Sequence, residues 1–152
     1  LKGNHDYWWT TAAKFYKFCA AHGWDDMFIL NNNCYYYGDI ALCGTRGWFY
    51  EEDRGGTHDE KVFRRELGRL ETSLKAAGKR EKLCFLHYPP RYQGYECPEI
   101  LELLERYGVR RCYYGHLHAE SHRLALQGNW HGIEFQLVSA DYVNFRPVKI
   151  LD

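Results

Sequence analysis

The sequence predicts an α/β domain with mixed sheets, and three patterns in it support this class. Strand-like apolar runs at 81–87 and 109–114 follow segments with helical periodicity. Two pairs of β-rich runs flank turn residues, within 34–43 and 121–140, and these predict hairpins. Strands separated by helices pair in parallel, whereas hairpins add antiparallel strands, so the sheets are expected to be mixed.

Three segments are expected to be helical: 10–22, 57–77 and 98–108. The second has an apolar stripe at helical spacing, and Gly78 follows it as a stop. The stripe consists of Val62, Phe63, Leu67, Leu70 and Leu74. Thr57 and Glu60 fit a capping box at the start of this helix, and Pro98 suits the first position of the third helix.

β-rich composition and turn residues predict strands at 27–30, 34–37, 40–43, 81–87, 109–114, 121–127, 133–140 and 148–151. The continuous apolar centre of the run 81–87 indicates a strand that is buried on both faces. Pro89 and Pro90 cannot continue a helix or a ladder, so they fix how the chain leaves His87. The last run is expected to be an edge strand.

Charge and composition exclude some classes of partner. Basic and acidic residues number 20 each, so no net field draws the chain to nucleic acid or to an anionic membrane. No apolar run approaches the length of about 20 residues that a membrane helix needs. The tyrosines at 35–37 and 113–114 are expected to pack within strands, because no basic stripe accompanies them for base stacking. The oligomeric state is left open.

Six cysteines are present, and none forms a Cys-x-x-Cys motif. Four of them lie within apolar strand-like runs: Cys34, Cys43, Cys84 and Cys112. Buried free thiols are therefore expected, in preference to a disulfide framework or a thiolate zinc site. Free thiols are typical of a reducing compartment, so the expected localisation is cytoplasmic.

Three short motifs with histidine stand where predicted strands end. They are Gly3-Asn4-His5-Asp6, then His87 after the run 83–86, and Gly115-His116-Leu117-His118 after the run 109–114. Ligands of open α/β sheets gather outside the carboxyl ends of the strands, so the three motifs predict one shared metal site. Neutral imidazole suits zinc, iron, manganese and nickel, whereas amide and carboxylate oxygens favour manganese or magnesium, so the identity of the ion stays open.

The spacing of the last two histidines also carries a geometric expectation. In extended backbone, residues two apart point to the same side, so His116 and His118 would enter one site while Leu117 packs behind them. Arg46, in a loop rich in glycine and charge, could bind a phosphate group of the substrate or could be an ordinary solvated loop arginine. His122 is expected on a strand, where a ligand role is improbable.

The three motifs, in this order, resemble the last three motif blocks of the calcineurin-like metallophosphoesterases. The stretches 44–48, 86–90 and 139–142 further resemble a bacterial branch of predicted phosphohydrolases. The resemblance implies an αββα sandwich with a dinuclear centre of two divalent ions (manganese, iron, zinc or magnesium). It also implies hydrolysis of phosphomonoesters or phosphodiesters by a metal-activated water.

The resemblance assigns roles to individual residues. It implies that Asn4, His87 and His116 bind the second metal and that His118 binds the first. It implies two catalytic residues: His5 as proton donor or transition-state stabiliser beside the ester, and Asp6 as the group that orients the His5 ring. An acidic neighbour raises the pKa of an imidazole and fixes its tautomer, which makes this pairing chemically reasonable.

One departure from the family pattern qualifies these expectations. The family has Asp-x-His and Gly-Asp blocks ahead of Gly-Asn-His-Asp, and no residue precedes Leu1 here. We expect residues 1–152 to be the C-terminal portion of a single, N-terminally truncated metallophosphoesterase domain, with weak or no hydrolysis by the isolated chain. Two alternatives remain: a mononuclear His-rich zinc-binding domain, and an inactive pseudoenzyme that acts as a binding module.

Overall fold

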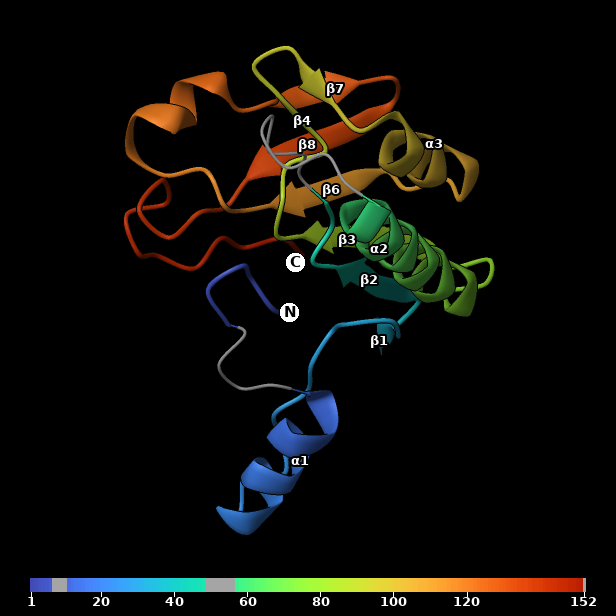
Figure 1. Ribbon diagram of the computed structural model, residues 1–152, viewed down its shortest axis with the longest axis vertical. Helices are drawn as coiled ribbons and strands as arrows, with labels where there is room; N and C mark the ends of the chain where they lie inside the picture. The colour runs from blue at the N-terminus through green and yellow to red at the C-terminus, as the bar shows by residue number, and fades with distance from the viewer. Residues whose placement is uncertain (7–10, 49–56, 152) are drawn as a thin grey trace.

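A six-stranded mixed sheet forms the centre of the protein, whose computed structural model describes residues 1–6, 11–48 and 57–151 (Figure 1). The strands follow the order β1-β2-β3-β6-β8-β7. Their bounds are β1 (Tyr35–Tyr37), β2 (Ile40–Thr45), β3 (Glu81–Leu86), β6 (Arg111–Tyr114), β7 (Gly128–Trp130) and β8 (Ile133–Leu137). The outer strands β1 and β7 are antiparallel to their neighbours, and the inner pairs are parallel, so the predicted α/β class with a mixed sheet is confirmed.

The four inner strands end at one line across the sheet. Thr45 of β2 is in register with Leu86 of β3, which is in register with Tyr114 of β6 and, through it, with Leu137 of β8. All four residues are nearly fully buried. Because parallel strands run in the same direction, the four loops that follow them leave from the same edge of the sheet.

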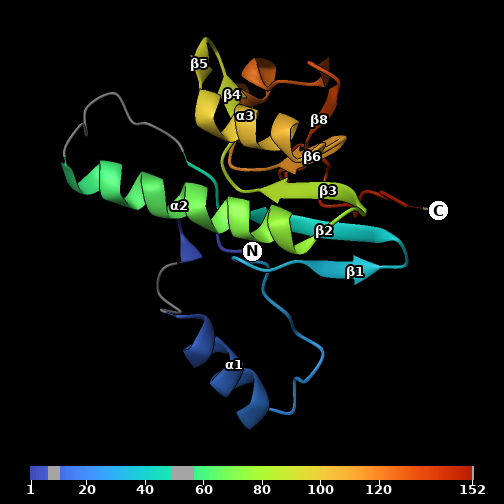
Figure 2. The ribbon, with the colours of Figure 1, turned by 90° about the vertical axis from the view of Figure 1, so that its right-hand side faces the viewer.

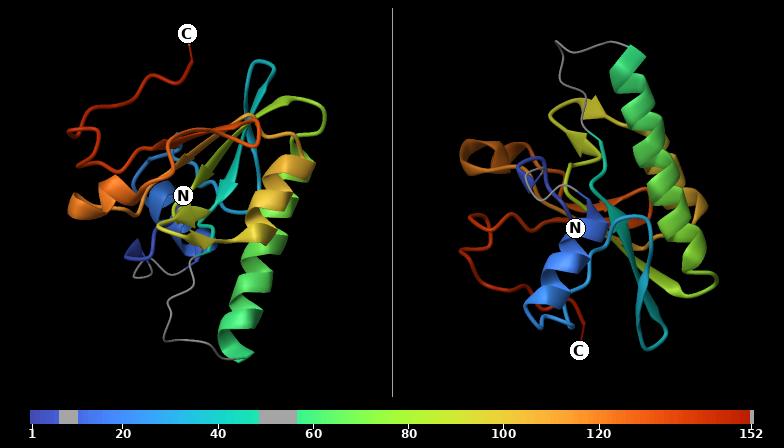
Figure 3. Two further views of the ribbon diagram at one scale, coloured as in Figure 1. Left: turned by 90° about the horizontal axis from the view of Figure 1, so that it is seen from above. Right: turned by 60° about the horizontal axis from the view of Figure 1, so that its bottom comes forward.

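Helices α2 and α3 pack side by side on one face of the sheet (Figure 3). The helices are α1 (Ala12–Ala21), α2 (Thr57–Ala76) and α3 (Pro98–Arg106). Leu70 and Leu74 of α2 and Leu104 of α3 are at most 1% exposed, so the predicted apolar faces do point into the core. Burying each such leucine stabilises the fold by about 1.5–3 kcal/mol. Pro98 occupies the first turn of α3 as expected, whereas the side chain of Thr57, in the expected capping box, lies outside the described part.

Helix α1 projects away from the sheet, as Figures 1 and 2 show from two sides. Thr11 caps it by accepting a hydrogen bond from Lys14 N, and Cys19 is its one fully buried residue. The segment 27–30 after it is not a strand, so the predicted strand there is wrong. Phe28 is 66% exposed, so the apolar run that suggested a strand does not pair with the sheet.

Two further strand predictions near the C-terminus are also wrong. Residues Ala119–Leu124 form the 3-10 helix η2 in place of a strand at 121–127, and the hairpin is confined to β7 and β8. No strand forms at 148–151, where Arg111 donates a side-chain hydrogen bond to Ile150 O at 3.0 Å. The sequence also gave no indication of the short hairpin of β4 (Arg91–Tyr92) and β5 (Tyr95–Glu96).

The cysteines are all free, as predicted, and most are deeply buried. Cys43, Cys84 and Cys112 lie opposite one another on β2, β3 and β6, and each is 0% exposed. Burial raises the pKa of the Cys43 thiol to about 12, so it stays protonated near neutral pH. No helix within the described residues is long and apolar enough to cross a membrane.

Candidate metal centre

The carboxyl ends of the inner strands bring most of the predicted site residues to one edge of the sheet. Arg46 follows β2, His87 follows β3, the loop 115–118 follows β6, and the loop that contains Asp141 follows β8. Backbone hydrogen bonds continue past the strands: His87 N donates to Arg46 O at 3.0 Å, and Gly115 N donates to His87 O at 3.2 Å. The sheet therefore fixes how these loops lie relative to one another.

Asn4, His87 and His116 form one contiguous group of polar side chains at this edge. His87 Nε2 lies 2.7 Å from Asn4 Oδ1 and 3.2 Å from His116 Nδ1. The two imidazole rings meet edge to face, and the ring of Tyr88 packs against both, with centroids 4.9 Å from His87 and 4.6 Å from His116. The fold thus brings His87 and His116, which lie 83 and 112 positions after Asn4 in the sequence, to the same place.

Gly3 allows the N-terminal turn to approach His87 closely. A Cβ atom at this position would lie 3.0 Å from His87 Cε1 and 3.1 Å from His87 Nδ1, tighter than ordinary contacts. Gly3 N donates a hydrogen bond to Asp6 Oδ2 at 2.8 Å, which closes the turn. A side chain at this position would therefore press on the His87 ring.

Electrostatics keep His87 neutral. Burial, together with the nearby His116, lowers its pKa from 6.5 to about 4, while Asp6 acts in the opposite direction. A neutral imidazole retains a lone pair on one nitrogen, which is the form that can coordinate a metal ion or accept a proton.

The backbone at the Gly-His-Leu-His motif departs from our expectation. His116 has a φ of 71°, in the left-handed region, so the backbone is not extended throughout 116–118 although His118 itself is, and the assumed parallel pointing of the two histidines is wrong. Leu117 is 4% exposed and does pack inward as predicted. His116 faces His87, whereas His118 makes a hydrogen bond to Asp141 instead.

His118 belongs to a second polar group, centred on Asp141. Asp141 Oδ1 accepts from His118 Nδ1 at 2.8 Å, and Asp141 Oδ2 accepts from Ala119 N at 3.0 Å and lies 3.1 Å from His122 Nε2. The hydrogen bond from Ala119, reinforced by the two imidazoles, holds the pKa of Asp141 well below its usual range. His122 was set aside because a strand was expected there; the 3-10 turn that actually forms puts its ring beside this carboxylate.

A family model for calcineurin-like phosphoesterases matches residues 1–120. The match covers more than half of the chain and contains all three histidine motifs. The chain belongs to the calcineurin-like phosphoesterase family. A search of the curated proteins and a search of the solved structures each found no match. Membership implies metal-dependent hydrolysis of phosphate esters, and it confirms the resemblance that the motifs indicated.

The two residues predicted to be catalytic in this calcineurin-like phosphoesterase lie beside the Asn4 turn. His5 is exposed, and Asp6 is half-buried with its carboxylate directed to Gly3 N. Within the described residues no hydrogen bond joins Asp6 to the His5 ring, so the expected orienting contact is not formed here. Their catalytic roles stay predictions.

Arg46 is held inside a cluster of charged and aromatic groups. Its side chain is 13% exposed, and its guanidinium lies 3.9 Å from the buried carboxylate of Glu66 and faces the rings of Trp48 and Tyr88 at 6.0 and 5.7 Å. Glu66 also accepts a hydrogen bond from Thr45 Oγ1 at 3.0 Å. Arg46 is thus no solvated loop arginine, and its positive charge contributes to the lowered pKa of His87.

The donor set of this calcineurin-like phosphoesterase fits part of a metal centre. No group of three or more His, Cys, Asp or Glu side chains in the described ranges is arranged to hold a metal ion. The group of Asn4, His87 and His116 is of another kind, because one of its three donors is an amide oxygen. It combines the neutral nitrogens and the oxygen that divalent ions such as zinc and manganese accept.

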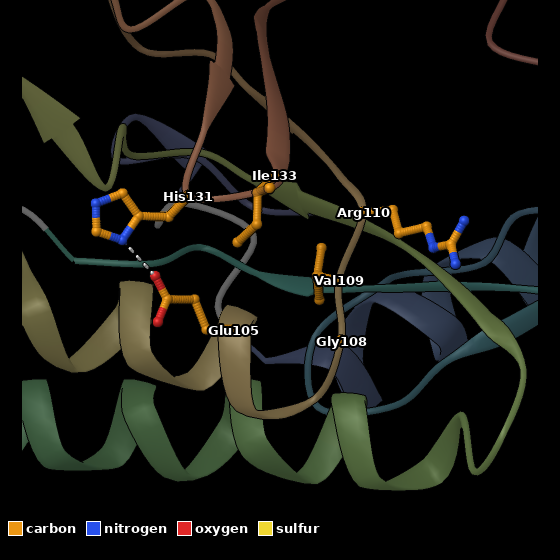
Figure 4. Close-up of a pocket in the computed structure, with 7 residues that line it drawn as sticks. Glu105, Gly108, Val109, Arg110, His131 and Ile133 are labelled. Atoms are coloured by element: carbon orange, nitrogen blue, oxygen red, sulfur yellow. Dashed lines mark hydrogen bonds and ion pairs between the residues drawn. The ribbon is translucent and has the colours of Figure 1, made fainter.

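A separate depression of about 520 Å³ lies at the opposite, amino-terminal edge of the sheet. It is bounded by the end of α3, the start of β6 and the turn between β7 and β8, and no predicted site residue lines it. His131 Nδ1 lies 3.1 Å from Glu105 Oε1 there, while Arg110 points away from this pair (Figure 4). The depression is therefore separate from the two polar groups that contain His87, His116 and His118.

Proposed function

We propose that this protein hydrolyses phosphomonoester or phosphodiester bonds at a dinuclear metal centre built on the loops after β3 and β6. In this proposal Asn4, His87 and His116 hold one divalent ion, and His118 contributes to a second. The observation that supports it is the convergence of Asn4 Oδ1 and His116 Nδ1 on His87 Nε2, at 2.7 and 3.2 Å, in a chain of the calcineurin-like phosphoesterase family.

The spacing of these atoms suits donors that share an ion. Two donors on one tetrahedral zinc ion, at bond lengths of about 2.0–2.1 Å, lie about 3.3 Å apart. The distance of 3.2 Å between His87 Nε2 and His116 Nδ1 is close to this value. His87 Nε2 donates a hydrogen bond to Asn4 Oδ1, and an ion bound by these atoms would replace the proton in this bond.

The chemistry divides between the bound ions and the chain. Divalent ions supply positive charge at the phosphoryl oxygens and lower the pKa of water to near neutrality. His5, exposed beside Asn4, can reach a substrate and protonate its leaving oxygen. Arg46 can add positive charge for the phosphate, although its pairing with Glu66 equally supports a structural role.

Metal stoichiometry tests the proposal most directly. The full chain would be titrated with Zn²⁺ or Mn²⁺ by calorimetry, and hydrolysis would be measured with p-nitrophenyl phosphate and bis(p-nitrophenyl) phosphate. Since the described residues provide few ligands for a second ion, we expect low turnover. The metal titration is therefore the measurement that decides whether the proposed site exists. His116→Ala should weaken binding, whereas His131→Ala, a matched change at the far edge, should leave it intact. Absence of binding by the unaltered chain contradicts the proposal.

A second candidate is a site for one zinc ion with a structural or different hydrolytic role. It is favoured by the hydrogen bond of His118, which is made to Asp141 and not to the group of Asn4, His87 and His116. Binding of one ion per chain that survives His118→Ala, with no ester hydrolysis, would select this candidate. Two ions per chain, with one lost in His118→Ala, would select the dinuclear centre.

A further inference from the structure

Asp141 joins two segments that are distant in the sequence. One oxygen of its carboxylate accepts from His118, and the other accepts from Ala119 N and faces His122. Asp141 lies in a tight turn after β8, in which Val143 N donates to Ser139 O at 3.1 Å. Through this one side chain, the loop after β8 is attached to the loop after β6.

From this geometry we infer that Asp141 is a positioning residue that fixes the His118 ring with its Nδ1 protonated and its Nε2 free. The inference rests on the proposed function in one respect, namely that His118 Nε2 serves as a metal ligand. The family match ends at residue 120, so it does not extend to Asp141.

The chemistry of the contact determines the tautomer of His118. An ionised carboxylate can only accept hydrogen bonds, so an imidazole nitrogen that is hydrogen-bonded to it carries a proton. Asp141 accepts a hydrogen bond from Nδ1 of His118, whereas Nε2 of His122 lies 3.1 Å from the carboxylate without forming a hydrogen bond. The neutral His118 ring should therefore adopt the Nδ1–H tautomer.

The surroundings hold the carboxylate in place for this task. Ala119 has a φ of 50°, an unusual conformation for a residue with a Cβ, and its N–H is directed at Asp141 Oδ2. The His122 side chain is 21% exposed and packs edge to face on the ring of Tyr142, with centroids 5.2 Å apart. His118 itself is 62% exposed, so without Asp141 its ring would have little to restrain it.

Long-range ¹⁵N–¹H spectra of the histidine rings test the inference without any metal. They would be recorded at about pH 8.5, about two units above the ordinary imidazole pKa. The unaltered chain should show Nδ1–H for His118. If the folded, unaltered chain shows the Nε2–H tautomer for His118, the inference is overturned regardless of the results with any variant.

The variant Asp141→Asn provides a second test, with Asp39→Asn in the exposed β1–β2 turn as the matched control. The amide of the new asparagine at position 141 can turn an N–H toward His118. We therefore expect His118 to lose the Nδ1–H tautomer and the zinc affinity to fall by about 10–100-fold. An unchanged zinc affinity in this variant overturns the positioning role. If the unaltered chain binds no zinc, the proposed function fails, and the tautomer of His118 alone then decides whether Asp141 holds the ring.

Discussion

The close pairing of β2 with β3, the strand that leads to His87, leaves no room for a side chain at Gly44. Gly44 lies in β2 directly opposite Phe85 of β3, two residues before His87, and its φ is 148°. A Cβ atom built there would lie 1.9 Å from Phe85 O and 2.8 Å from Phe85 C. Both are backbone atoms, so no side-chain rotation can relieve the overlap.

The size of the effect follows from these distances. To accept alanine at position 44, β2 and β3 must separate by more than an ångström, in a sheet where Gly44 N also donates to the buried Ser73 Oγ at 2.9 Å. Overpacking in cores costs about 1–3 kcal/mol and occasionally more. A backbone conformation that favours glycine adds strain of about 1–3 kcal/mol. We therefore expect Gly44→Ala to lower the free energy of unfolding by about 4 kcal/mol.

Urea unfolding followed by far-UV circular dichroism measures this directly. Gly68→Ala is the matched control: Gly68 is an exposed position inside α2, and nothing lies within 4 Å of its added Cβ. Alanine there should stabilise the protein by about 0.5–1 kcal/mol. If the free energy of unfolding of Gly44→Ala lies within about 1 kcal/mol of that of the unaltered chain, the steric reasoning about the β2–β3 pair is refuted.

Three further predictions concern the core and the thiols. Leu70→Ala should cost about 3 kcal/mol in urea unfolding, since Leu70 is 1% exposed; a loss below about 1 kcal/mol would show that the core collapses around it. Glu66→Gln should cost about 1–3 kcal/mol by the same measurement, because it removes the buried negative charge that pairs with the guanidinium groups of Arg46 and Arg69; an unchanged unfolding midpoint would contradict that. With Ellman's reagent at pH 8, the half-buried Cys34 should react first and Cys43 only after unfolding, and early labelling of Cys43 would be the contrary result.

The regular elements were predictable where local pattern and packing agree. The run 81–87 is apolar throughout, and β3 is indeed buried within the sheet. Pro98 and the leucines after it predicted α3, and Gly78, with a φ of 58°, follows the end of α2 as expected. In these segments propensity, turn chemistry and apolar periodicity all favour the same structure.

The errors occur where tertiary contacts decide. The run 27–30 is apolar, yet only Ile29 is buried, and Tyr16 binds its backbone N–H through a side-chain oxygen in place of a neighbouring strand. Residues 119–124 form a 3-10 turn whose first N–H is bound by Asp141, which lies about twenty residues away in the sequence. A pattern read over a short window contains no information about such distant partners.

The candidate site was predictable in its residues but not in its geometry. The motifs named Asn4, His87 and His116, and the in-register strand ends explain why the two histidines meet. The prediction that His116 and His118 point to the same side was wrong because His116 adopts a left-handed φ. The Gly-His-Leu-His motif by itself does not reveal this φ. The pairing of His118 with Asp141 depends on how β8 ends beside β6, and that is a property of the sheet.

The loop after β6 contains two residues with strained backbone conformations, and hydrogen bonds hold it at both ends. His116 and Ala119 both adopt left-handed φ values, of 71° and 50°, which cost about 1–3 kcal/mol each in residues other than glycine. Gly115 N is tied to His87 O and Ala119 N to Asp141, so the strained loop is fixed at both ends by neighbouring parallel strands. A change that frees only one end, such as Asp141→Asn, should therefore disturb His118 more than His116. Comparing ring ¹⁵N shifts of the two histidines in that variant tests this order, and an equal disturbance of both would contradict it.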